Sequence, residues 1–146
     1  VALGSSVDLV ISLGPALAGF EAWAEYVNSS TPGTIGGPTD DADNDGRNNL
    51  YEYALNGNPT NATNKGTDPT FVKVGDEFIY THVKRLNDTN LTYALKITTD
   101  LVNGSWISAG AAETDGASAG DYKESVNTLT IPSGSAGYLR LEIKKD

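Results

Sequence analysis

The spacing of apolar residues predicts helices in the first part of the chain. Five apolar residues recur at steps of three and four and so share one helical face: Leu13, Ala16, Phe20, Trp23 and Val27. This helix is predicted over about residues 15–28, with Pro15 as its first residue. A second, shorter helix is predicted from about Asn49 to Leu55, because the Asn-Gly-Asn-Pro sequence that follows stops a helix.

From Phe71 onward the hydrophobic period changes to two, which is typical of strands. Strands are predicted over residues 71–74, 77–85, 91–99, 106–109, 123–131 and 138–144. Residues 110–120 are rich in glycine, alanine and serine and are predicted to form a surface loop. The fold is therefore predicted to be mainly β, an antiparallel β-sandwich preceded by a short helix–loop–helix segment. We expect residues 1–64 and 65–146 to form one compact unit.

The loop between the two predicted helices matches the calcium-loop pattern D-x-[DN]-x-[DN]-G-x5-E at every specified position. Calcium takes six to eight oxygen ligands, which a loop supplies when alternate side chains point inward and a glycine permits a sharp turn. The expected ligands are the side chains of Asp41, Asp43, Asp45, Asn49 and Glu52, together with the backbone carbonyl of Arg47. The sequence thus predicts Ca²⁺ as the bound cofactor, and magnesium fits less well because it prefers fewer carboxylates. A solvated acidic turn is the alternative.

Composition excludes several classes of function. The 19 acidic and 10 basic residues give a net charge of −9, which disfavours nucleic acid as a partner. The chain has no cysteine, so disulfides and thiolate sites are excluded. The least polar stretch, residues 1–20, is interrupted by Asp8 and several small polar residues, so no membrane span is expected.

The acidic motif, with the Glu52-Tyr-Ala-Leu-x-Gly-x-Pro59 sequence that completes it, resembles the calcium loop of bacterial thrombospondin type 3 repeats. It is less similar to dockerin and EF-hand loops. Further short motifs resemble a C-terminal module of large secreted proteins from Verrucomicrobia and Planctomycetes: Phe20-x-x-Trp23, Leu91-Thr-Tyr93, Thr99-Asp-Leu101 with Trp106, and Tyr138-Leu-Arg140-Leu. This resemblance implies a non-catalytic appendage of an exported protein, often a polysaccharide-degrading enzyme. We therefore expect a secreted or cell-surface location and a parent catalytic domain in the same chain.

Catalysis is not expected of this chain itself. A Ser-His-Asp arrangement requires an imidazole, and His82 is the single histidine of the sequence. No Gly-x-Ser-x-Gly turn accompanies it, so we expect His82 to be a partly exposed strand residue. The clustered acids are assigned to the cation rather than to a pair of glycosidase carboxylates.

Strand alternation predicts a basic and aromatic binding surface. Tyr80, His82 and Lys84 fall on one face of their strand, and Lys96 and Arg140 fall on the polar faces of two later strands. If these strands are neighbours, the five side chains form a patch suited to an anionic polysaccharide, such as a sulfated galactan or a uronate. Scattered, solvated basic side chains are the equally weighted alternative.

The leading expectation for function is a calcium-stabilised carbohydrate-binding module that targets a secreted polysaccharide-degrading enzyme to its substrate. The main alternative is a structural or sorting module that links a secreted protein to the cell surface or the secretion machinery without binding a glycan. A third possibility is protein docking in the manner of a dockerin, against which the presence of only one such loop counts.

Overall fold

The computed structural model describes residues 18–31, 33–130 and 137–146, and these residues form two helices and seven strands. The helices are α1 (Gly19–Ser30) and α2 (Asn49–Leu55). The strands are β1 (Thr70–Val74), β2 (Glu77–Arg85), β3 (Leu91–Thr98), β4 (Ile107–Ser108), β5 (Ala112–Ala119), β6 (Tyr122–Thr130) and β7 (Tyr138–Lys145). In this part of the chain, neither helix has the length and apolar character that a bilayer crossing demands.

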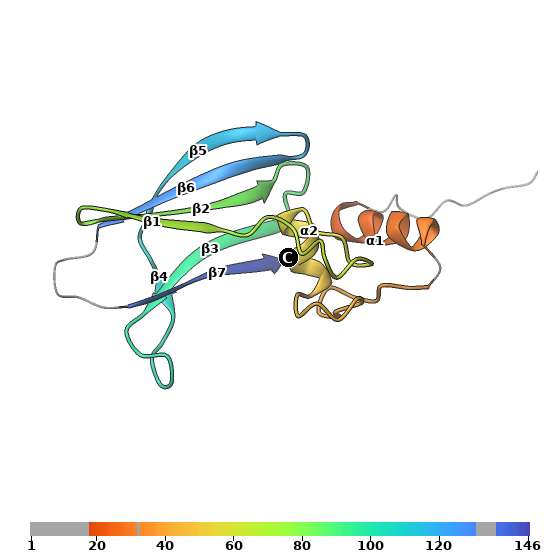
Figure 1. Cartoon of the computed structure of the whole chain (residues 1–146), viewed down its shortest axis with the longest axis horizontal. Helices are drawn as coiled ribbons and strands as arrows, with labels where there is room; N and C mark the ends of the chain where they lie inside the picture. The colour runs from red at the N-terminus through yellow and green to blue at the C-terminus, as the bar shows by residue number, and fades with distance from the viewer. Residues whose placement is uncertain (1–17, 32, 131–136) are drawn as a thin grey trace, which may run out of the picture.

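The strands form two antiparallel sheets, which confirms the predicted mainly β, antiparallel fold (Figure 1). The first sheet has the order β1-β2-β6-β5, and the second has the order β4-β3-β7. Every pairing within the two sheets is antiparallel. Among the described residues, each sheet keeps two edge strands, so the sheets are not closed into a barrel.

Helix α1 begins at Gly19 and continues to Ser30, two residues beyond the predicted end. The hydroxyl groups of Ser29 and Ser30 both donate to the carbonyl of Tyr26, so these serines satisfy a backbone acceptor near the end of the helix. The predicted contributions of Leu13 and Pro15 lie outside the described residues. Phe20, on the predicted apolar face, is 3% exposed.

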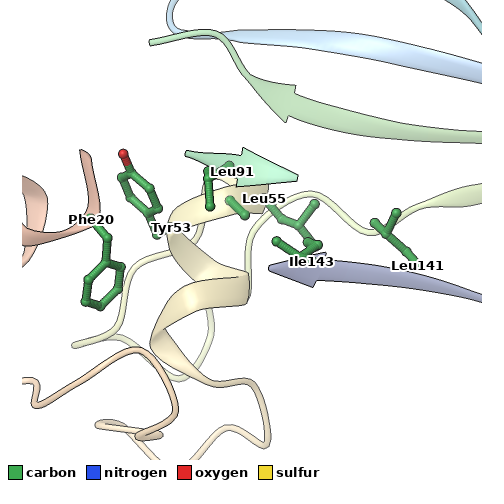
Figure 2. Packing of buried hydrophobic residues seen from close by; sticks show 7 residues of the cluster. Phe20, Tyr53, Leu55, Leu91, Leu141 and Ile143 are labelled. Atoms are coloured by element: carbon green, nitrogen blue, oxygen red, sulfur yellow. The ribbon is translucent and has the colours of Figure 1, made fainter. Parts of the chain in front are cut away.

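A cluster of buried apolar side chains lies where the helices meet one end of the sheets (Figure 2). Helix α1 contributes Phe20 and α2 contributes Tyr53, Ala54 and Leu55. Strand β3 contributes Leu91, and β7 contributes Leu141 and Ile143. Side chains from the predicted segments 1–64 and 65–146 therefore share one core. Because α2 is only seven residues long, its stability depends on this packing.

Six of the seven strands occur where the sequence predicts them, but the predicted loop over residues 110–120 is wrong. Residues 112–119 form β5, which pairs with β6. All eight residues of β5 are exposed, so burial imposes no alternation of apolar and polar side chains on this strand. A register shift between Asp115 and Ser118 further disrupts its pattern.

Strand β1 is the other edge of the four-stranded sheet, and it exposes apolar side chains to solvent. Phe71, Val72 and Val74 are each about half exposed. Lys73, the fourth of the five residues of this strand, lies over the ring of Phe78 on β2, with its ammonium nitrogen 5.2 Å from the ring centroid. The edge thus combines a β-prone sequence with a single charge, that of Lys73.

Candidate metal centre

The loop before α2 brings three aspartates together. One carboxylate oxygen from each of Asp41, Asp43 and Asp45 lies within 4.8 Å of the others, so this cluster can hold a metal ion. Two left-handed residues, Asn44 at φ 60° and Gly46 at φ 89°, turn the backbone around the cluster. Glycine adopts such a conformation without strain from a Cβ atom, as the motif requires.

Backbone amides of the loop hold the aspartates in place. The amide of Asp45 donates to Asp41 Oδ1 at 3.1 Å and to Asp43 Oδ1 at 3.2 Å. The amide of Gly46 donates to Asp41 Oδ2 at 2.9 Å, and that of Arg47 donates to Asp45 Oδ1 at 2.7 Å. These bonds fix one side of the cluster, and they leave Oδ2 of Asp43 and of Asp45 without a hydrogen-bond partner among the described residues.

Glu52 adds two further oxygens that have no partner. It lies in α2, is 0% exposed, and neither of its carboxylate oxygens finds a donor in the described part of the chain. Glu52 is not a member of the 4.8 Å aspartate group, but it is close enough for the charges of the aspartates to shift its pKa. Burial, followed by repulsion from Asp43, Asp45 and Asp41, raises the pKa of Glu52 from 4.5 to about 7. A buried carboxylate in this position is costly unless a cation or a proton compensates it.

Asn49 connects the loop to the preceding segment. Its side-chain nitrogen donates to the carbonyl of Ile35 at 2.6 Å and to that of Gly37 at 2.9 Å. Asn49 is fully buried, and its Oδ1 has no hydrogen-bond partner among residues 18–31, 33–130 and 137–146. The sequence predicted only an oxygen ligand at this position and missed the anchoring role of the amide nitrogen.

Asn48 and Arg47 join the loop to its other neighbours. Asn48 caps α2, since its Oδ1 accepts from the amide of Tyr51 at 3.0 Å. The Arg47 guanidinium donates to the carbonyl of Lys65 at 2.8 Å and to Asp68 Oδ1 at 2.7 Å. The Lys65 ammonium in turn donates to the carbonyl of Asp45. Sequence reasoning missed Lys65 and Asp68, because no local motif links residues 65–68 to the loop.

The predicted polysaccharide patch is not assembled as one surface. The predicted patch required three strands to be neighbours, but β2 lies in the four-stranded sheet, whereas β3 and β7 lie in the other sheet. His82 stacks on Tyr93 of β3, with ring centroids 5.6 Å apart, so its side chain faces the second sheet. His82 is 3% exposed, which corrects the expectation of a partly exposed residue, and burial lowers its pKa. Tyr80 and Lys84, which alternate with His82, share this inward face.

Lys96 and Arg140 lie together on the opposite side of the second sheet. They are directly paired in the register of β3 and β7. Tyr93 faces the first sheet, and side chains alternate along a strand, so Lys96 and its partner Arg140 face away from it. The Arg140 guanidinium lies 4.3 Å from the ring centroid of Trp106.

Apart from Arg47, the sequence-predicted residues therefore fall into four groups in the structure. Asp41, Asp43 and Asp45 form a cluster, and the buried oxygens of Asn49 and Glu52 lack partners among the described residues. The five residues of the predicted glycan patch divide into an inward set on β2 and an outward pair on β3 and β7. In comparisons with known proteins, no family model, no curated protein and no solved structure matches the chain.

Proposed function

We propose that this chain is a calcium-binding, non-catalytic module of a secreted protein, and that it binds carbohydrate to target an attached polysaccharide-degrading enzyme. One observation carries the metal part of the proposal. Five buried oxygens of Asp43, Asp45, Asn49 and Glu52 have no hydrogen-bond partner among the described residues. Native structures leave few buried polar atoms unpaired, so the concentration of these oxygens in the loop and in α2 favours a bound cation.

The chemistry of these donors favours calcium over other cations. All the donors are oxygens, and most belong to carboxylates, which are the preferred ligands of hard cations. Calcium accepts six to eight such oxygens in a flexible geometry. Magnesium demands a near-octahedral shell and keeps several of its waters. The left-handed Gly46 matches the turn that calcium loops make at this position.

The ion would stabilise the junction between the helices and the sheets. Glu52 belongs to the same seven-residue helix as Tyr53, Ala54 and Leu55, which enter the core. A ligand present at 1,000 times its dissociation constant adds about 4 kcal/mol to the free energy of unfolding. In a module of this size, that is a large share of the total stability. The proposed role of calcium is therefore structural.

Two features of the described structure support a non-catalytic role, one at His82 and one at the metal centre. His82 is buried, and its Nδ1 lies 3.0 Å from the carbonyl of Val83, so the imidazole is engaged within the sheet. The acidic side chains that lie close together, Asp41, Asp43 and Asp45, are accounted for by the cation. The pair formed by the half-buried Lys96 and the exposed Arg140 supplies polar contacts of the kind that carbohydrate binding needs.

A structural or sorting module that binds no glycan is the second candidate, and the metal loop is compatible with it because the ion serves stability in both cases. A glycan array separates the two. The calcium-loaded protein is applied to neutral and acidic glycans, and saturable binding supports the carbohydrate-binding module. Absence of binding across the array contradicts it and favours the second candidate.

The metal proposal is tested by titrating chelator-treated protein with Ca²⁺ and, separately, with Mg²⁺ in a calorimeter. We expect one calcium site per chain and weaker binding of magnesium. The double substitution Asp43→Asn and Asp45→Asn should remove the calcium signal. A matched double substitution of two acids outside the loop, Glu25→Gln and Asp121→Asn, should retain it. Equal calcium binding by both double variants would contradict the assignment of the loop.

A further inference from the structure

We infer that the outer face of the three-stranded sheet binds a polysaccharide that carries sulfate or carboxylate groups. This inference rests on the proposed carbohydrate-binding function and assigns it a surface and a ligand charge. The outer face is defined by Lys96, Trp106, Arg140, Glu142 and Lys144. Its members come from β3, from β7 and from the residue just before β4.

The register of the sheet places these side chains on one surface. Lys96 pairs directly with Arg140 and with Ser108, and Ala94 pairs with Glu142. Arg140, Glu142 and Lys144 are alternate residues of β7, so they follow one another along the same face at about 6–7 Å intervals. The row is therefore long enough to contact several sugars of an extended chain.

Trp106 holds Arg140 in a fixed orientation. The central carbon of the guanidinium lies over the indole ring, 4.3 Å from the ring centroid, at the distance of a cation–π contact. Its Nη2 is also 3.4 Å from Glu142 Oε1, while the side chain remains 45% exposed. A planar guanidinium held on an aromatic ring presents its remaining N–H groups to solvent, in the geometry that binds sulfate and carboxylate with two hydrogen bonds. Trp106 acts here as a positioning residue.

The charge of the outer face is opposite to that of the protein. Three basic side chains and Glu142 give this face a charge of +2, whereas the whole chain carries −9. Lys96 and Arg140 are direct cross-strand neighbours, an arrangement of like charges that destabilises a sheet. Lys96 makes no ion pair with an acid in the part of the chain that the structure describes. An anion bound between Lys96 and Arg140 would remove this repulsion.

Charge density favours a polysaccharide over a nucleic acid. Duplex DNA carries one negative charge per about 1.7 Å of its axis, and the acidic remainder of this protein would repel it. A polyuronate or a singly sulfated polysaccharide carries one charge on each sugar, so it can meet an isolated basic face with less repulsion. The sugar hydroxyls of such a polysaccharide can also form hydrogen bonds with Ser108, which is the cross-strand neighbour of Lys96.

The inference is tested by measuring the affinity of the calcium-loaded protein for three immobilised polysaccharides: a sulfated galactan, a polygalacturonate and a neutral galactan. We expect binding to at least one acidic polymer and at least tenfold weaker binding to the neutral one. The two acidic polymers distinguish sulfate from carboxylate as the recognised group. The double variant Lys96→Ala and Arg140→Ala should lower the affinity for the acidic polymer at least tenfold.

The matched control is the double variant Lys123→Ala and Lys145→Ala, which removes the same charge from outside the outer face and should change the affinity less than threefold. Trp106→Ala should weaken binding and Trp106→Phe should restore most of it, whereas a purely electrostatic role for this face predicts no effect of either. The calcium-induced rise in melting temperature reports whether each variant is folded.

Three results would overturn the inference, and they can be told apart. Stronger binding to the neutral galactan places carbohydrate recognition elsewhere and leaves the proposed function standing. Equal loss of affinity in the outer-face and control variants shows that net charge, rather than this surface, governs binding. Absence of binding to all three polymers contradicts both the inference and the carbohydrate-binding function.

Discussion

Substitution of Glu52 by glutamine separates the cost of its buried charge from its value as a metal ligand. The amide nearly preserves the shape of the side chain, so packing in α2 is unchanged. Glu52 supplies two of the four carboxylate oxygens that are buried without a partner in the described structure. Losing this charge should weaken calcium binding by about 100-fold, which corresponds to about 2.7 kcal/mol.

The size of the effect follows from linkage. Wild-type protein at a calcium concentration 1,000 times its dissociation constant gains about 4 kcal/mol, or about 8–16 °C in melting temperature for a domain of this size. The same calcium concentration would be about ten times the dissociation constant of Glu52→Gln. Calcium would therefore add about 1.4 kcal/mol to the free energy of unfolding of this variant, or about 3–6 °C to its melting temperature. In chelator the order reverses, because the variant no longer buries a carboxylate beside three aspartates.

The assay is differential scanning calorimetry of both proteins at pH 7.5, in 1 mM calcium and in chelator. Glu25→Gln is the matched control, since Glu25 is exposed on α1 and lies outside the loop. Its calcium response should equal that of the wild type. A calcium response of Glu52→Gln equal to the wild-type response would show that Glu52 is not a ligand. Absence of any calcium response in the wild type would refute the metal assignment as a whole.

Three further predictions test the loop and the core. Gly46→Ala should lower the free energy of unfolding by about 1–2 kcal/mol, because the left-handed backbone at this position strains a residue that has a Cβ atom. The space around Gly46 is open, so no steric clash adds to this cost. Thermal melts in calcium will measure the change. In chelator the melting temperature should be higher at pH 6 than at pH 8. The folded-state pKa of Glu52 is raised to about 7, so the stability gained from its protonation is complete below about pH 4.5 and is lost as the pH rises through 7. Glu52→Gln should reduce the difference in melting temperature between pH 6 and pH 8. An unchanged difference would contradict the reasoning. Leu55→Ala, at a position 2% exposed, should cost about 2–5 kcal/mol in urea denaturation, whereas Leu86→Ala, at a position 49% exposed, should cost less than about 0.5 kcal/mol.

Local patterns in the sequence were sufficient to predict the elements that depend on local chemistry. The acidic motif and the Asn-Gly-Asn-Pro sequence located α2 to the residue, because caps and turns are formed by near neighbours. Asn56 adopts φ 66° at the end of this helix, as a C-terminal stop requires. The strand from Glu77 to Arg85 was also located to the residue, since alternation and flanking turns defined it.

Features that depend on long-range pairing could not be predicted in this way. Alternation assigned Tyr80 to a basic and aromatic strand face and Lys96 to a polar strand face, but it does not reveal which strands are neighbours. The division of these two residues between sheets depends on the pairing of β2 with β6 and of β3 with β7. Strand β5 was missed because its exposed side chains carry no burial pattern.

The two edge strands of the four-stranded sheet, β5 and β1, differ in how readily another chain could pair with them. Along β5, the acid Asp115 and the register shift next to it interrupt the row of backbone groups on which another strand could align. Along β1, a single ammonium group at Lys73 interrupts a run of Phe, Val and Val. Loss of that one charge leaves Phe71, Val72 and Val74 on an uncharged edge strand, which is a template for intermolecular β-sheet growth, so we expect substitutions that remove the Lys73 charge to lower the solubility of the protein.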